Sequence, residues 1–151
     1  MAKWLVVSDS HGGLSPLSRL KNKHPDVEGL LFLGDGLSEL HRYSGGFKQV
    51  AAVKGNCDFM ANAPEEMILS LGGQKVYLCH GHQWSVKSGL MSLCLRAREL
   101  GATVALFGHS HRYTEEFCQG VFMLNPGAFA SGSYAVLTLT PDTIKAERFF
   151  V

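Results

Sequence analysis

The sequence has no long apolar run, no cluster of basic residues and no closely spaced pair of cysteines. A membrane-spanning helix needs about 20 consecutive apolar residues, so the lack of such a run argues against a membrane protein. The 14 Lys and Arg residues nearly balance the 13 Asp and Glu residues. We therefore expect neither nucleic acid nor a membrane as a stable partner.

The 4 cysteines, Cys57, Cys79, Cys94 and Cys118, are widely spaced and contain no CxxC pair. This spacing favours free thiols over a disulfide framework. The apolar run near the N-terminus, in MAKWLVVSDS, is too short for a signal peptide. Together these features predict a cytoplasmic protein.

A chain of 151 residues that is 46% hydrophobic and 18% charged predicts one domain spanning residues 1–151. Apolar runs alternate with helical patterns, and hairpin patterns follow. We expect strands at 3–7, 29–34, 49–56 and 103–108. We expect one helix to start at Ser15–Pro16 and others near 37–43 and at 88–101. Hairpins are expected within 66–82, 113–125 and 133–150, with turns at Gly72–Gly73, Gln119–Gly120 and Pro141–Asp142. These elements predict an α/β fold with two sheets and helices outside.

Side chains that bind metals follow the expected strands directly. Ligands of open α/β sheets gather beyond the carboxyl ends of the strands, so these loops are expected to converge on one pocket. The candidate ligands are Asp9, His11, Asp35, Asn56, His80, His109 and His111.

This mixture of imidazoles and carboxylates suits borderline divalent metals. Seven ligands exceed the needs of one catalytic metal that keeps an open position, and they suit two metals that share a carboxylate. Asp35 is a good candidate for the carboxylate that bridges the two metals, because Gly34 and Gly36 on either side leave room for close approach. Two adjacent metals can hold a hydroxide and a phosphoryl oxygen.

Each motif has a simpler interpretation when it is taken alone. An Asp after a strand is usually a turn or a helix cap. Asn56 can supply a left-handed turn, and His80 can be a hydrogen-bonded core histidine. The joint occurrence of the motifs, each after an apolar run, favours a site.

The ordered set of motifs resembles the calcineurin-like metallophosphoesterase superfamily. The matching segments are Asp9-Ser10-His11, Gly34-Asp35, Gly55-Asn56, His80 and Gly108-His109-Ser110-His111. The short chain and the sequence GNCD are similar to the small bacterial and archaeal phosphodiesterase branch, of the YfcE type. The segment NPGAFASG (125–132) also resembles a loop of the superfamily near the site.

The resemblance implies a four-layer α/β/β/α sandwich of two mixed sheets with a dinuclear centre. It assigns one metal to Asp9, His11, Asp35 and His111, and the other to Asp35, Asn56, His80 and His109. A metal-bridging hydroxide would attack the phosphorus of a small phosphoester. We expect two divalent ions, and we expect Mn²⁺ in preference to Fe, Ni, Co or Zn.

The two histidines of GHSH are expected to lie on an extended backbone, which would turn both imidazoles to the same side. One strand end would then set one ligand for each metal.

Cys57 is a departure from the superfamily, because many members have a histidine at this position that assists the transfer. A thiol with an ordinary pKa of about 8.5 is a poor proton donor to a leaving group. We therefore single out His82, to take part of that role or bind substrate, and Asp58, to orient a ligand or a water.

Two other functions remain open at this stage. A phosphomonoesterase would need further positive groups, for which the loops offer Lys54, Lys87 and Arg112. A protein-interaction scaffold of the retromer-subunit type would not need seven costly polar ligands. Exposed hairpin edges and aromatic residues such as Phe149 and Phe150 leave self-association into a homo-oligomer open.

Overall fold

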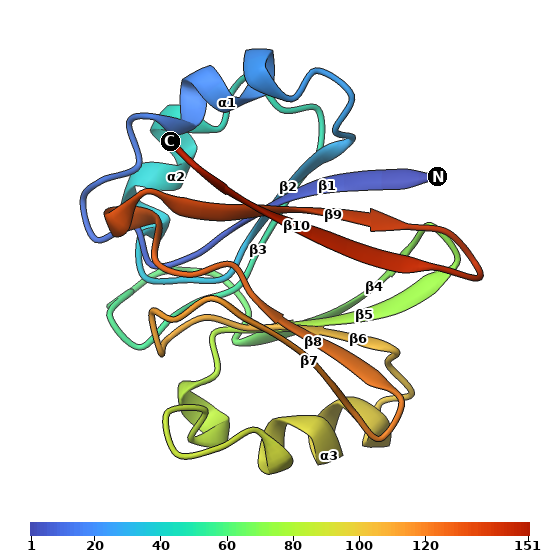
Figure 1. Ribbon diagram of the computed structural model, residues 1–151. Helices are drawn as coiled ribbons and strands as arrows, with labels where there is room; N and C mark the ends of the chain where they lie inside the picture. Colours follow the sequence, from blue (N-terminus) through green and yellow to red (C-terminus); the bar gives the residue numbers. More distant parts are fainter.

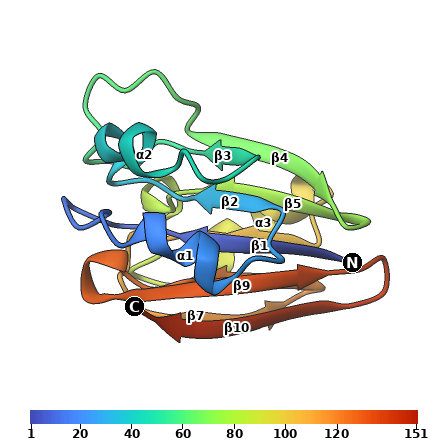
Figure 2. The ribbon, with the colours of Figure 1, turned by 90° about the horizontal axis from the view of Figure 1, so that it is seen from above.

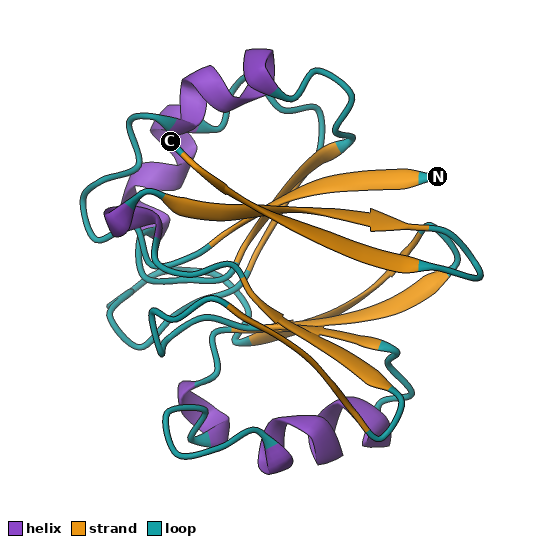
Figure 3. Ribbon diagram, in the orientation of Figure 1, coloured by secondary structure: helices purple, strands orange, loops and turns teal.

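Two five-stranded sheets stack face to face in the computed structural model, which describes residues 1–151 (Figure 1). Helices cover the outer face of each sheet (Figure 3). The expected four-layer α/β/β/α sandwich of two mixed sheets is therefore confirmed.

The first sheet has the strand order β10-β9-β1-β2-β3. Its strands β1, β2 and β3 are parallel, and β9 and β10 extend the sheet as an antiparallel hairpin. The bounds are Ala2–Val7 for β1, Gly29–Phe32 for β2, Val50–Ala52 for β3, Ser133–Leu139 for β9 and Ile144–Phe150 for β10.

The second sheet has the order β4-β5-β6-β8-β7. Its centre is parallel, and an antiparallel strand lies at each edge. The bounds are Glu66–Leu71 for β4, Gln74–Cys79 for β5, Val104–Leu106 for β6, Thr114–Cys118 for β7 and Val121–Asn125 for β8.

Helices α1 (Leu17–Lys23) and α2 (Leu37–Tyr43) pack on the first sheet (Figure 2), and α3 (Met91–Glu99) packs on the second. Two short 3-10 turns, η1 (His82–Trp84) and η2 (Phe129–Ser131), complete the helical elements. No helix has the length and apolar character needed to cross a membrane.

The alternating side chains of β1 explain its continuous apolar sequence. Trp4 and Val6 join the core between the sheets, whereas Leu5 and Val7 join the core beneath α1 and α2. Successive side chains of a strand point to opposite faces, so a strand buried on both faces is apolar throughout. Each sheet is thereby held rigidly, and its strand ends can present the loops that follow.

The three hairpins turn where the sequence predicts, between β4 and β5, β7 and β8, and β9 and β10. Other local expectations are wrong. Pro16, not Ser15, occupies the N-cap position of α1. The third strand ends at Ala52 instead of residue 56, because the next residues bend towards the loop after β2. Phe149, which the sequence offers for self-association, stacks on Tyr134 within the chain at a ring-centroid distance of 5.7 Å.

Candidate metal centre

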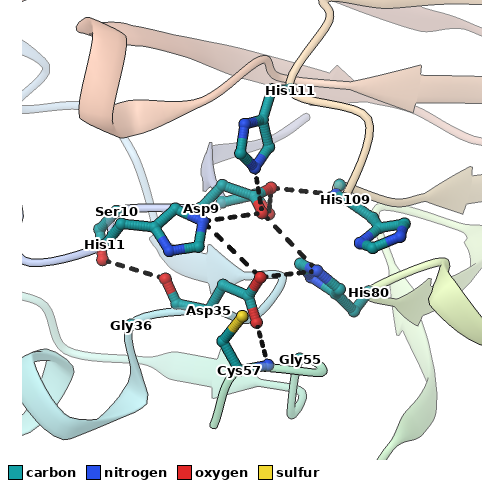
Figure 4. A network of polar contacts seen from close by, with 12 residues as sticks. Asp9, Ser10, His11, Asp35, Gly36, Gly55, Cys57, His80, His109 and His111 are labelled. Atoms are coloured by element: carbon teal, nitrogen blue, oxygen red, sulfur yellow. Dashed lines mark hydrogen bonds and ion pairs between the residues drawn. The ribbon is translucent and has the colours of Figure 1, made fainter. Parts of the chain in front are cut away.

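Loops from both sheets meet at one edge of the sandwich (Figure 4). Asp9, Asp35 and Asn56 follow β1, β2 and β3 of the first sheet. His80 and His109 follow β5 and β6 of the second sheet. These are the carboxyl ends of parallel strands, where α/β folds bind ligands. Residues distant in sequence are thus brought together by the stacking of the two sheets.

Asp9 is buried, and its two carboxylate oxygens differ in their contacts. Oδ2 accepts hydrogen bonds from Ser8 Oγ at 2.6 Å and from the backbone N–H of His109 at 3.0 Å. Oδ1 is buried and has no hydrogen-bond partner. One oxygen is therefore fixed by the protein, and the other is left for a ligand.

Three imidazole nitrogens surround Asp9 Oδ1. The Nε2 atoms of His111, His80 and His11 lie 3.2, 3.6 and 3.7 Å from it. Asp9, His11 and His111 each offer an atom within 4.8 Å of the others, and so do Asp9, Asp35 and His80. A carboxylate oxygen among imidazole nitrogens is a donor set that borderline divalent metals prefer.

Asp35 is also almost fully buried, and it lies between His11 and His80. Its Oδ1 accepts the backbone N–H of Cys57 at 2.8 Å. Its Oδ2 lies 3.1 Å from His80 Nε2 and 3.7 Å from His11 Nε2. Burial raises the pKa of Asp35, but His80 and the Cys57 N–H outweigh it and hold the pKa well below its usual range. A single oxygen thus stands between two histidines.

His80 is fixed by its other nitrogen. Its Nδ1 donates to the carbonyl of Leu33 at 2.7 Å, which leaves Nε2 as the free lone pair that a metal requires. Nε2 is buried and has no hydrogen-bond partner. Burial lowers the pKa of His80, but the carboxylates of Asp35 and Asp9 outweigh burial and leave it raised.

His82 and His109 lie beside His80. The ring centroids of His80 and His109 are 5.2 Å apart, and that of His82 lies 5.6 Å from His80 and 6.1 Å from His109. Burial, together with His80, lowers the pKa of both flanking histidines. Asn56 is exposed, and its Nδ2 contacts Cys57 Sγ at 3.6 Å. His82 and His109 therefore join the cluster of rings, and Asn56 stands at its rim.

Asp58 holds the loop after β2 through backbone hydrogen bonds. Its Oδ2 accepts the backbone N–H groups of Asp35 at 2.7 Å and Gly55 at 2.8 Å. Its Oδ1 accepts those of Gly36 at 2.9 Å and Leu37 at 3.0 Å. Asp58 thus positions Asp35 and caps the start of α2.

Left-handed backbone is concentrated in the centre. Eight non-glycine residues have positive φ, and 5 of them are candidate ligands: Asp9, His11, Asp35, His109 and His111. The expected extended backbone through GHSH is wrong, because φ is 69° at His109 and 62° at His111. Such conformations cost about 1 kcal/mol or more each and cluster at functional sites.

Two glycines permit the close packing of the loops. A Cβ at Gly108 would lie 2.5 Å from Asp9 Oδ2 and would overlap Ser8 Oγ. A Cβ at Gly55 would lie 2.6 Å from the backbone nitrogen of Asp35. Real Cβ atoms do not approach this closely, so larger residues would displace both carboxylates.

Two polar residues that support the centre, Glu39 and Asn125, are not among the candidates that the sequence motifs indicate. Glu39 of α2 accepts from Ser10 Oγ at 3.0 Å and from the Gly12 N–H at 3.0 Å. Buried Asn125 donates to the Gly108 carbonyl at 3.1 Å and to Ser110 Oγ at 3.0 Å. Glu39 has no sequence signal beyond a polar residue near an apolar run, whereas Asn125 begins the segment NPGAFASG that resembles a superfamily loop near the site.

The donor set fits a pair of divalent ions. Asp9 Oδ1 and His80 Nε2 are buried polar atoms without partners, and burying such atoms costs free energy unless something binds them. They belong to the clusters of Asp and His atoms that lie within 4.8 Å of one another. Ions bound there would satisfy both atoms.

Cys57 does not have the features of a protein nucleophile. All 4 cysteines are free, and Cys57 is exposed. Burial and the nearby Asp35 carboxylate raise the pKa of its thiol, so the reactive thiolate is disfavoured.

The fold and the site together define a protein suited to binding divalent ions, and the comparisons with known proteins give the family. Residues 3–142 match the calcineurin-like phosphoesterase superfamily domain, and the chain belongs to this superfamily. The predicted resemblance is therefore confirmed.

The relatives agree with this assignment. The chain is 39% identical over 153 residues to the probable metallophosphoesterase YsnB of Bacillus subtilis, covering 97% of this chain and 89% of YsnB. The crystal structure of a predicted phosphoesterase from Streptococcus pneumoniae matches with a TM-score of 0.83 and 29% identity, covering 99% of this chain and 91% of that one. Vps29 of Entamoeba histolytica, crystallised with Zn²⁺, shares the fold with a TM-score of 0.75 and 22% identity, covering 98% of each chain.

Proposed function

We propose that this protein is a metal-dependent phosphodiesterase that hydrolyses a small phosphoester at a dinuclear centre. The observation that carries the proposal is the pair of buried, unpartnered atoms, Asp9 Oδ1 and His80 Nε2, contributed by different sheets of a phosphoesterase fold.

Two ligand groups share Asp35, because its Oδ2 lies between His11 and His80. Two divalent ions, with Mn²⁺ preferred over Fe, Ni, Co or Zn, would supply a hydroxide nucleophile and neutralise the phosphate. The first group is Asp9, His11, Asp35 and His111, and the second is Asp35, Asn56, His80 and His109.

His82 is proposed to bind the substrate. Its ring stands beside His80 and His109, so a ring nitrogen can hydrogen-bond an ester oxygen near both groups. With Cys57 in place of a histidine, the chain has no strong proton donor at that position, and substrates with good leaving groups are favoured.

A hollow beside Cys57 supports a diester rather than a monoester. It has a volume of about 560 Å³ and no Lys or Arg in its lining, which is formed by Leu37, Ser38 and residues 57–63. This lining suits the uncharged second substituent of a diester. Lys87 and Arg112 lie together in a separate hollow of about 520 Å³ that also contains Glu116. A monoesterase would have to recruit these cations for the dianion.

The scaffold alternative is disfavoured by the same unpartnered atoms. A protein that only binds partners gains nothing from buried atoms that lack hydrogen bonds in the absence of an ion. We also propose that the protein acts in the cytoplasm on a small-molecule substrate, since its 4 free cysteines suit a reducing compartment.

The test is hydrolysis of bis(p-nitrophenyl) phosphate and of p-nitrophenyl phosphate with added Mn²⁺. His109→Ala is expected to lower diester hydrolysis by at least about 100-fold, since even residues that only orient metal ligands change activity by about 10- to 100-fold. His41→Ala, on the exposed side of α2, is the matched control. Unchanged activity of His109→Ala would refute the dinuclear assignment, and faster monoester hydrolysis would favour the phosphomonoesterase.

A further inference from the structure

Cys57 brings a sulfur atom to the edge of the candidate metal centre. Its Sγ, an imidazole nitrogen of His11 and a carboxylate oxygen of Asp35 all lie within 4.8 Å of one another. Figure 4 shows the sulfur next to the Asp35 carboxylate. Neither of the two proposed ligand groups uses this sulfur.

The backbone fixes Cys57 against Asp35. The Cys57 N–H donates to Asp35 Oδ1 at 2.8 Å. Asp58, the next residue, accepts the N–H groups of Asp35 and Gly55 on its Oδ2. Cys57 and the next residue, Asp58, are thus both hydrogen-bonded to Asp35, whose other carboxylate oxygen faces His11 and His80.

A second observation points to an ion at the same place. Asp9 Oδ1 lies 3.7 Å from His11 Nε2, is buried and has no hydrogen-bond partner. An ion bound by His11 and Asp35 would therefore meet an unsatisfied oxygen on one side and the Cys57 sulfur on the other.

We propose that Cys57 is a sulfur ligand of the ion held by His11 and Asp35, and that the sulfur raises the affinity of this position for soft divalent ions such as Zn²⁺ and Cd²⁺ without changing its affinity for Mn²⁺. The inference rests on the metal centre proposed above, although not on its substrate. A metal–sulfur bond forms, and the thiol proton passes to solvent, as for any cysteine that binds a metal.

The geometry allows this bond after a small movement. In a tetrahedral zinc site, sulfur and nitrogen ligands stand roughly 3.5 Å apart, given metal–ligand distances near 2.3 and 2.0 Å. The side chain of Cys57 is exposed and turns about a single torsion, so it can shorten the observed separations. Hard ions such as Mn²⁺ prefer oxygen and nitrogen and gain little from sulfur.

The test uses the metal-free protein loaded with Co²⁺ and followed by absorption spectroscopy. The wild-type protein is expected to show visible ligand-field bands together with a sulfur-to-cobalt charge-transfer band in the near ultraviolet. Cys57→Ser is expected to keep the ligand-field bands and lose the charge-transfer band. Cys118→Ser, which alters a half-buried thiol at the end of β7, is the matched control and keeps both.

Metal affinities provide a second measurement. Cys57→Ser is expected to weaken Cd²⁺ binding by at least about 10-fold and to leave Mn²⁺ binding within about threefold. Ligand-field bands without a charge-transfer band in the wild-type protein would overturn the inference and leave the metal centre intact. The absence of any cobalt bands would overturn both.

Discussion

Asp58→Asn is expected to destabilise the protein although Asp58 touches no side chain of the proposed ligands. Each carboxylate oxygen of Asp58 accepts two backbone N–H groups, from Asp35 and Gly55 or from Gly36 and Leu37. An asparagine has one acceptor oxygen, so its NH2 group would face two of these backbone N–H donors and could accept from neither. Hydrogen bonds to charged groups contribute about 1.5–3 kcal/mol each.

Losing two such bonds predicts a decrease of about 4 kcal/mol in the free energy of unfolding, a large part of the roughly 5–15 kcal/mol of a typical domain. Urea unfolding of the metal-free protein in a chelator measures this change. The displaced Asp35 backbone should also weaken Mn²⁺ binding by about 10- to 100-fold in a calorimetric titration.

Asp142→Asn is the matched control, since Asp142 is exposed in the turn between β9 and β10 and should change the stability by less than about 0.5 kcal/mol. A decrease of less than about 1 kcal/mol in the free energy of unfolding of Asp58→Asn, with unchanged Mn²⁺ affinity, would refute the role given to the hydrogen bonds of Asp58.

Three further predictions concern other parts of the chain. Gly108→Ala should lower the thermal midpoint and abolish tight Mn²⁺ binding, because its Cβ would lie 2.5 Å from Asp9 Oδ2; near-native affinity would contradict this. His82→Gln should lower the rates of diesters with good and with poor leaving groups by similar factors, because His82 is proposed to bind the substrate, and a larger decrease for poor leaving groups would contradict this role. Burial and the neighbouring Lys23 lower the pKa of His24 from 6.5, so protonation favours the unfolded state. The contribution of neutral His24 to the free energy of unfolding should therefore be fully present above pH 6.5 and decrease below it. Urea unfolding measured at several pH values should show a smaller decrease for His24→Gln than for the wild-type protein.

The location of the candidate ligands could be predicted from the sequence because each one follows an apolar run. An apolar run of this kind predicts a strand buried on both faces, and loops after parallel strands gather at one edge. The hairpin turn at Gln119–Gly120 was predictable for a similar reason, since its two residues can adopt the positive φ of 48° and 85°.

The conformations within the centre could not be predicted in this way. The backbone of His109 is left-handed, and in this conformation its N–H donates to Asp9, a residue 100 positions earlier. The hydrogen bonds of Asp58 likewise depend on the approach of Gly36 and Leu37, which lie 22 and 21 positions earlier. Local patterns carry no information about partners that meet only after the two sheets have stacked.

The left-handed backbone at His11 and His111 has a consequence for how this chain can evolve. Their side chains are 35% and 50% exposed, so they contribute little to the core. Glycine at either position would relieve about 1 kcal/mol of strain, partly offset by its greater freedom in the unfolded chain. Stability and metal binding thus favour different residues at these positions. Both histidines will persist only under selection for the reaction, and a lineage that abandons it can replace them and keep its fold.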